Sequence, residues 1–404
     1  MPFLPISIVS ALLHAWIGWR IVPALRALAG WPATAWSLGL LLLLSALLMP
    51  LAFRLARRAD KPGWLAAGVW LGLVLMGMFS SLFVLTFLRD VLLLLAWLLY
   101  WLLSLGGLRL FSLDAVQAVT AGAVPLLALA ATVWGFWNAR RTAAVLPVDV
   151  PIRGLPQALH GFRIAQISDI HIGPTIHGPY LRRIVARVNG THPDMVAITG
   201  DLVDGTVANL APQVASLADL RSRHGTFFVT GNHEYYSGAL PWIDVLRGLG
   251  IQVLLNQHVV IDHAGADAGA SGAALLVAGV TDFSAESFVA SHRSDPRAAL
   301  AGAPTGVALR VLLAHQPRSA FAAQQAGFDL QLSGHTHGGQ FWPWNHFVRF
   351  QQPFTAGLNR LGKLWVYTNR GTGYWGPPKR FGVASEITLL RLVVARKGQW
   401  PSPT

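Results

Sequence analysis

Histidine, aspartate and asparagine recur in short motifs along the C-terminal part of the sequence. The motifs are Asp169-Ile170-His171, Gly200-Asp201-Leu202-Val203-Asp204, Gly231-Asn232-His233-Glu234, Ala314-His315 and Gly334-His335-Thr336-His337. Each follows an apolar run that is typical of a buried strand. Imidazole, carboxylate and amide groups suit Mn, Fe or Zn, and the chain has no cysteine to supply a thiolate. The motifs therefore predict a metal site built from His, Asp and Asn.

The spacing of these residues indicates how they converge. We expect Asp169 and His171, and likewise His335 and His337, to lie in extended segments, where residues two apart point the same way. Glycines permit sharp turns beside the motifs, and they stand at positions 200, 231, 334, 338 and 339. The candidate ligands are too many for one ordinary site, and a carboxylate can bridge two ions about 3.5–4 Å apart. The predicted centre is therefore binuclear.

Strand and helix signals alternate through the same region, which predicts an α/β domain at residues 158–395. Strands are expected at 162–167, 195–198, 227–230, 274–280, 307–313, 330–332 and 364–367, and a helix at 180–189. The motifs stand at the carboxyl ends of these strands, where α/β sheets place their sites. Residues 143–157 predict a linker into the first strand, 264–273 a hairpin loop or insertion, and 396–404 a tail.

The first 142 residues have the composition of a membrane protein. Hydrophobic residues make up 53% of the chain and charged residues 12%, about half the usual charged share. Stretches long enough to cross a bilayer lie at 34–56, 64–88, 91–108 and 113–137. A fifth candidate at 5–28 is interrupted by Arg20 and Pro23, so it could span, lie at the interface or act as a signal anchor. We therefore predict a helical transmembrane region of four to five spans.

Basic residues give an expected orientation. Arg54, Arg57-Arg58 and Lys61 form the strongest basic loop, which the positive-inside tendency places in the cytoplasm. Three predicted spans follow this loop and would carry the catalytic domain to the extracytoplasmic face, although Arg140-Arg141 at the last exit favours the reverse. The net charge of +13 is scattered rather than clustered. It therefore predicts anionic head groups or phosphorylated substrates as partners, and no nucleic acid.

From about Leu155 to Leu392 the sequence resembles the calcineurin-like metallophosphoesterase superfamily, in its membrane-associated bacterial branch. Besides the motifs, Gly357, the stretch 370–378 and Glu386-Ile387 are similar to the usual ending of that branch. The resemblance implies two packed mixed β-sheets flanked by helices, in a multi-pass protein of a bacterial cell membrane. It also implies two divalent metal ions, one held by Asp169, His171, Asp201 and His337 and the other by Asp201, Asn232, His315 and His335.

The resemblance further implies hydrolysis of phosphomonoesters or phosphodiesters, including lipid-linked or cell-envelope substrates, by a hydroxide that bridges the metals. His233 matches the histidine that this family places beside the leaving group, as a general acid or hydrogen-bond donor. Asp204 is expected to orient His233 or a metal ligand, or else to cap the following segment. Glu234 is expected to support its loop by hydrogen bonds to the backbone.

Other interpretations stay open at this point. A catalytically silent membrane sensor or scaffold would keep the fold, although it would have no chemical reason to keep the full ligand set. A channel or transporter would need polar residues along its spans, and these are scarce. A group near the C-terminus is expected either to bind substrate phosphate or lipid, or to close the sheet edge: Arg370, Tyr374, Trp375, Lys379 and Arg380.

Overall fold

The computed structural model of the chain describes residues 3–28, 32–55, 63–264 and 272–395. The chain divides into two compact units. The helical unit contains Met1–Arg140 together with Gly376–Phe381, and the α/β unit contains Arg141–Trp375 together with Gly382–Thr404.

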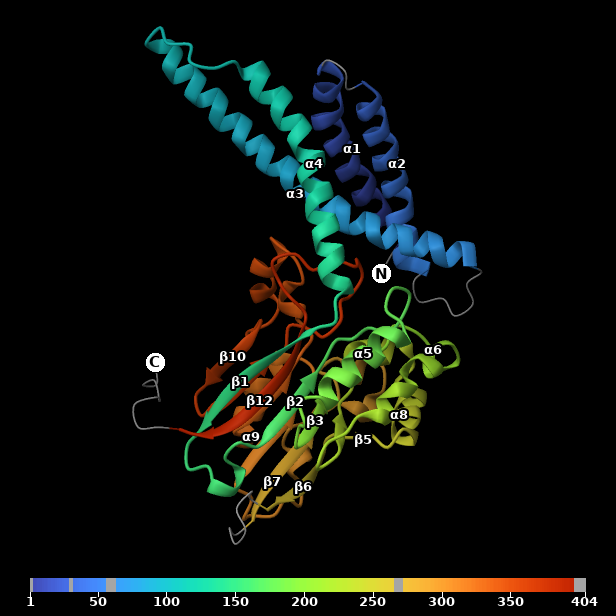
Figure 1. The fold of residues 1–404 in the computed structure, drawn as a ribbon, viewed down its shortest axis with the longest axis vertical. Coiled ribbons are helices and arrows are strands. Elements are labelled where there is room, and N and C mark those ends of the chain that lie inside the picture. Colours follow the sequence, from blue (N-terminus) through green and yellow to red (C-terminus); the bar gives the residue numbers. More distant parts are fainter. Residues whose placement is uncertain (1–2, 29–31, 56–62, 265–271, 396–404) are drawn as a thin grey trace. The chain divides into compact units, whose positions relative to one another are not determined.

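Long apolar helices make up most of the helical unit (Figure 1). They are α1 (Phe3–Ala27), α2 (Pro32–Leu55), α3 (Gly63–Leu105) and α4 (Leu113–Arg140). All four are long and apolar enough to cross a membrane, so the chain is a multi-pass membrane protein. The interrupted candidate at 5–28 is a continuous helix, with Pro23 inside it. Of the basic loop, Arg57, Arg58 and Lys61 lie outside the described residues.

The predicted spans at 64–88 and 91–108 are a single helix, which corrects the sequence-based division at Arg89-Asp90. α3 has 43 residues, and at 1.5 Å per residue it is about 64 Å long. Its charged pair is satisfied inside the bundle: Arg89 donates to the backbone oxygens of Arg20 at 3.3 Å and Gln117 at 3.2 Å. Arg20 donates to the Asp90 carboxylate at 2.8 Å. Because these charges have partners within the helical unit, they do not end the helix.

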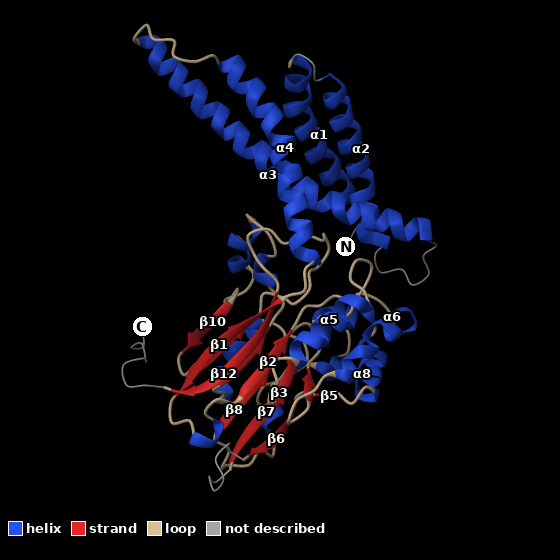
Figure 2. Cartoon of the chain, viewed as in Figure 1, coloured by secondary structure: helices blue, strands red, loops and turns tan. Residues whose placement is uncertain are grey.

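Two six-stranded sheets form the α/β unit (Figure 2), which confirms the predicted fold class. The first sheet runs in the order β1 (Ala144–Ile152), β12 (Glu386–Val394), β2 (Arg163–Ile167), β3 (Met195–Ile198), β4 (Thr226–Phe228) and β5 (Gln252–Val253). The second runs in the order β10 (Gly357–Leu361), β11 (Leu364–Thr368), β9 (Leu330–Ser333), β8 (Leu309–Leu313), β7 (Ala273–Gly279) and β6 (Gln257–His263). Both sheets mix parallel and antiparallel pairs.

The main core lies between the two sheets. Ile164 and Met195 of the first sheet pack in one buried cluster with Val277, Val311 and Leu330 of the second. Helices flank the sheets: they are α5 (Gly178–Asn189), α6 (Val207–Val214), α7 (Asn232–Ser237), α8 (Ala239–Gly248) and α9 (Ala320–Ala326). Figure 2 shows α5, α6 and α8 beside β3 and β5. The buried sheets therefore give the strand ends a rigid frame.

Segment 143–157, expected as a linker, contains β1. This strand pairs in parallel with β12 along its whole length, from Ala144 opposite Glu386 to Ile152 opposite Val394. Strand β12 in turn runs antiparallel to β2. The segment therefore begins the first sheet. The hairpin loop expected at 264–273 connects β6 and β7, which pair antiparallel, while its residues 265–271 lie outside the described part.

Candidate metal centre

The candidate ligands follow the carboxyl ends of strands, but their backbone is not extended as the sequence analysis expected. Five of them have positive φ angles: Asp169 (53°), His171 (56°), Asp201 (53°), His335 (71°) and His337 (51°). Such left-handed conformations are uncommon for non-glycine residues, and each costs on the order of 1–3 kcal/mol. The side chains therefore converge because the chain turns sharply after each strand, and not because residues alternate along one.

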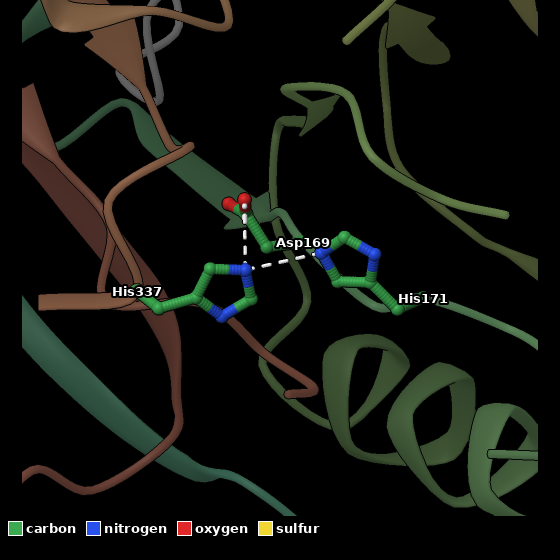
Figure 3. A group of neighbouring side chains, drawn as sticks. All are labelled: Asp169, His171 and His337. Carbon is green, nitrogen blue, oxygen red and sulfur yellow. Dashed lines mark hydrogen bonds and ion pairs between the residues drawn. The ribbon is translucent and has the colours of Figure 1, made fainter. Parts of the chain in front are cut away.

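One cluster joins the ends of β2 and β9 (Figure 3). Nε2 of His171 lies 3.0 Å from Nε2 of His337, and the latter atom lies 3.5 Å from Oδ1 of Asp169. Oδ2 of Asp201 lies 3.8 Å from Nε2 of His171. These four side chains are buried. They are the set that the family resemblance implied for the first metal ion.

A second cluster joins the ends of β3, β8 and β9. Nε2 of His315 lies 3.3 Å from Oδ2 of Asp201 and 3.2 Å from Nδ1 of His335. Nδ1 of His315 lies 2.8 Å from the carbonyl oxygen of Thr199, so it is placed to donate there and leave the lone pair of Nε2 for a cation. Asp201 thus takes part in both clusters.

Asn232 carries a buried oxygen that indicates a bound group near Asp201, because the amide of the next residue, His233, donates to Oδ1 of Asp201 at 2.9 Å. The Oδ1 atom of Asn232 is buried and has no hydrogen-bond partner among the described residues, and such an oxygen is costly to bury unless something binds it. Ligands of one ion lie roughly 3 to 3.5 Å apart when metal–nitrogen distances are about 2.0–2.1 Å. The spacing in both clusters is close to this range, so the side chains fit two divalent cations that share Asp201.

Asp204 lies behind two of the histidines. Its Oδ1 forms a short contact with Nδ1 of His233 and lies 3.3 Å from Nδ1 of His171. These contacts leave Nε2 of both rings facing the clusters, and Nε2 of His233 lies 3.9 Å from Oδ2 of Asp201. Burial alone would raise the pKa of Asp204, but the neighbouring His233 and His171 lower it well below its usual value. The geometry favours an orienting role over the alternative of a helix cap.

Glu234 binds backbone, as expected, and links two ligand loops. Its Oε2 accepts hydrogen bonds from the amides of Gly231 at 2.7 Å and Asp201 at 2.9 Å, and its Oε1 accepts from those of Leu202 at 2.8 Å and Val203 at 3.3 Å. Burial and the Asp201 carboxylate raise the pKa of Glu234 to about 7. This carboxyl group therefore fixes the bridging aspartate relative to Asn232 and His233.

Two glycines are required by close approach. A Cβ atom on Gly231 would lie 2.2 Å from Oδ1 of Asp201, and one on Gly334 would lie 2.0 Å from Oγ of Ser168. Neither position has room for a side chain. The Cβ-free backbone lets the ligand loops pack directly against the carboxylates.

Burial also keeps a ligand candidate neutral. Burial is the main cause that lowers the pKa of His335 to about 3, so at neutral pH the ring is uncharged and one of its nitrogens has a free lone pair. A histidine must be neutral to bind a metal ion. His335 therefore has the protonation state that coordination requires.

The C-terminal residues with two alternative expected roles have different surroundings in the structure. Arg370 donates to the Glu386 carboxylate of β12 at 2.7 Å, and the buried Tyr374 donates to the carbonyl of Thr175, in the loop after β2, at 3.1 Å. Both contacts therefore join segments at the strand ends. Trp375 instead lies beside His233, with ring centroids 5.9 Å apart. Lys379 and Arg380 belong to the helical unit, where Nζ of Lys379 donates to the carbonyl of Gly77 at 2.7 Å.

One neighbour of the site was missed by sequence reasoning. The ring of Tyr236 lies 5.2 Å from that of His233, and its side chain is exposed. Its position directly after the Gly231-Asn232-His233-Glu234 motif was the only available signal.

Two mixed sheets with a buried His/Asp cluster at their strand ends define a class of metal-dependent hydrolases. The profile of the calcineurin-like phosphoesterase family matches residues 162–339. A transmembrane protein with metallophosphoesterase domain from Danio rerio is 38% identical over 299 residues, which cover 71% of this chain and 67% of that protein. The chain therefore belongs to the calcineurin-like phosphoesterase family and is a metallophosphoesterase.

Other relatives come from distant organisms. The transmembrane protein with metallophosphoesterase domain from Bos taurus is 40% identical over 284 residues, covering 67% of this chain and 63% of that protein. An uncharacterised metallophosphoesterase of Campylobacter jejuni is 37% identical over 266 residues, covering 63% of this chain and 64% of that protein. The chain thus spans about two thirds of these relatives. Because vertebrate and bacterial proteins both match, these similarities do not establish the expected membership of a bacterial branch.

Proposed function

We propose that this protein is a membrane-anchored phosphoesterase that uses two divalent metal ions, Mn, Fe or Zn, to hydrolyse phosphomonoesters or phosphodiesters. The observation that carries the proposal is a set of buried His/Asp groups that adjoin one another: Asp169, His171 and His337; His171, Asp201 and His233; and Asp201, His315 and His335. Oδ1 of Asn232 supports it, because this buried atom has no hydrogen-bond partner among the described residues and the next residue, His233, donates its amide to Asp201. We further propose that Asp169, His171, Asp201 and His337 hold one ion, and that Asp201, Asn232, His315 and His335 hold the other.

When bound, two such cations lower the pKa of water to give a nucleophile and neutralise charge on the phosphoryl oxygens. In the overall reaction, the water oxygen bonds to phosphorus and the bond from phosphorus to the leaving oxygen breaks. That oxygen must gain a proton, and we assign the donor as Nε2 of His233. Asp204 acts as a positioning residue, because its contact with Nδ1 of His233 holds the ring with Nε2 facing the centre.

The proposed division of roles is tested by comparing two variants of the full-length protein. His233→Ala should keep both metal ions and lose roughly 10²–10⁴-fold in turnover of aryl phosphoesters, which is the usual contribution of a general acid. Asp201→Asn should lose metal and turnover together. Loss of metal in His233→Ala to the same extent would show that His233 is a ligand instead. The ratio of aryl monoester to aryl diester hydrolysis identifies the ester class.

We also propose that the catalytic domain faces the cytoplasm. The extracytoplasmic expectation rested on three spans after the basic loop, whereas two helices, α3 and α4, separate that loop from the α/β unit. Two crossings return the chain to the face that it left. Arg140-Arg141 then lies on the same face as Arg54, Arg57-Arg58 and Lys61, as the positive-inside tendency favours.

The absence of cysteine from the sequence makes this orientation simple to test. Val260→Cys places a thiol on an exposed residue of the α/β unit, and Leu108→Cys places one on an exposed residue between α3 and α4. In intact cells, a membrane-impermeant maleimide should label Leu108→Cys but not Val260→Cys. The reverse pattern would place the catalytic domain outside the cytoplasm.

A further inference from the structure

Exposed aromatic side chains surround the leaving-group side of the site. The ring centroid of His233 lies 5.2 Å from that of Tyr236 and 5.9 Å from that of Trp375. The ring centroids of Phe288 and Tyr236 lie 5.5 Å apart. Trp375 is 37% exposed and Phe288 49%. These rings lie next to the residue assigned as proton donor, so a leaving group there would meet apolar surface.

A second group of exposed aromatic side chains lies on the segment that follows the His335-x-His337 motif. The ring centroids of Trp344 and Phe347 lie 6.0 Å apart, and those of Phe347 and Phe350 lie 6.3 Å apart. Phe350 is 75% exposed. We call the set Tyr236, Phe288, Trp375, Trp344, Phe347 and Phe350 the aromatic rim.

Hydrogen bonds fix the two parts of the aromatic rim to each other and to the site. Gln340, three residues after His337, donates to the carbonyl of Trp375 at 3.0 Å and accepts from its amide at 2.9 Å. A Cβ atom on Gly339 would lie 2.2 Å from Cα of Asn345, so the segment folds tightly back on the turn that carries His337. The rim is thus built into the ligand loops.

The composition of the rim is that of a membrane interface. Large contiguous exposed apolar patches are uncommon on soluble proteins. Trp and Tyr favour the head-group region of a bilayer, and Phe is common on the face that interfacial segments bury in the membrane. Arg349 lies over the ring of Phe350 at 5.3 Å, where it can also meet anionic phosphates.

The path of the chain supports a bilayer as the occupant. α4 ends at Arg140 and β1 begins at Ala144, and residues this close in sequence span at most about 14 Å. Ala144 pairs with Glu386 of β12, and Thr388 of β12 pairs with Gln166, one residue before β2 ends. The chain therefore enters the α/β unit at the edge that carries Asp169.

From these observations we propose that the aromatic rim is a membrane-interface contact, through which the site takes an amphiphilic phosphoester whose apolar part stays in the lipid. The substrate class rests on the proposed function, whereas the membrane contact does not. Products would be an apolar alcohol or lipid and a phosphate or phosphomonoester.

A spin-label measurement on the full-length protein in phospholipid nanodiscs tests the contact directly. Phe347→Cys and Phe350→Cys, each labelled with a nitroxide, should collide more often with oxygen than with a water-soluble nickel complex. Val260→Cys, the exposed control on β6, should show the opposite preference. Rim labels that behave like the Val260 label would overturn the proposal, whether or not the protein hydrolyses phosphoesters.

Inhibition of aryl phosphoester hydrolysis tests the substrate class. Dodecyl phosphate should inhibit at least about tenfold more tightly than ethyl phosphate, because the alkyl chain is removed from water. In the combined variant Trp344→Ser, Phe347→Ser and Phe350→Ser, the two inhibitors should bind about equally tightly. In Val260→Ser, dodecyl phosphate should keep its advantage over ethyl phosphate. Equal inhibition by dodecyl and ethyl phosphate, or strong inhibition by phenyl phosphate alone, would contradict a lipid substrate and indicate a small or planar leaving group.

Discussion

Glu234 gives the sharpest quantitative prediction for the site. In Glu234→Gln one oxygen remains, which can keep one pair of the backbone hydrogen bonds, while the amide nitrogen faces the other pair of N–H donors. Two buried donors are then left without an acceptor, at about 1–3 kcal/mol each. The expected loss in free energy of unfolding is therefore about 2–6 kcal/mol, a large share of the roughly 5–15 kcal/mol of a typical domain.

The assay is thermal unfolding of the purified, metal-loaded protein, together with its metal content. For a domain of this size, 1 kcal/mol shifts the midpoint by roughly 2–4 °C, so the midpoint of the α/β unit should fall by at least about 4 °C. Metal content should fall as well, because Glu234 fixes the loop of Asp201. The control is Glu286→Gln, a partly exposed glutamate in the same unit, with an expected change within about 0.5 kcal/mol.

An unchanged midpoint and full metal content in Glu234→Gln would refute the argument from backbone hydrogen bonds. Equal losses in Glu234→Gln and Glu286→Gln would refute it too, since they would point to a general effect of lost charge. Only a loss of stability and metal that is specific to Glu234→Gln supports the view that Glu234 joins the two ligand loops by backbone hydrogen bonds.

Three further predictions concern the site and the membrane helices. Gly231→Ala should lose metal and turnover, because its Cβ would lie 2.2 Å from a carboxylate oxygen of the bridging aspartate, whereas Gly190→Ala, at a helix end with φ −65°, should keep both. Asp204→Asn should retain its metals but lower turnover about tenfold or more, because the orienting carboxylate beside His233 is lost; unchanged turnover would contradict that role. Asp90→Leu should destabilise the helical unit by about 1.5–3 kcal/mol, because it removes the charged hydrogen bonds that Arg20 donates, and thermal unfolding should show partial recovery when Arg20→Leu is added.

The clustering of these His and Asp side chains could be predicted from sequence, because each motif follows a short apolar strand and strand ends meet at one edge. The local geometry could not. Asp169 and His171 were expected in an extended segment, yet both have left-handed backbone, since a turn and not strand alternation directs them inward. A periodic pattern contains no signal for such strained turns.

Contacts between distant residues were also beyond the sequence. The division of α3 at Arg89-Asp90 failed because Arg20, far away in α1, neutralises the charge. The sequence left two roles open for Asp204, and its contacts with His171 and His233 favour the orienting one. The aromatic rim has no motif at all, since it is assembled from loops after several different strands.

The binuclear centre is tested most directly by the metal stoichiometry of the reconstituted full-length protein and its Asp201→Asn variant, measured with aryl phosphoester hydrolysis on the same samples. We expect two divalent ions per chain and metal-dependent turnover in the wild type, with both largely lost in the variant. One ion or none in an active wild type, or full metal loading and turnover in Asp201→Asn, would contradict a binuclear centre bridged by this carboxylate.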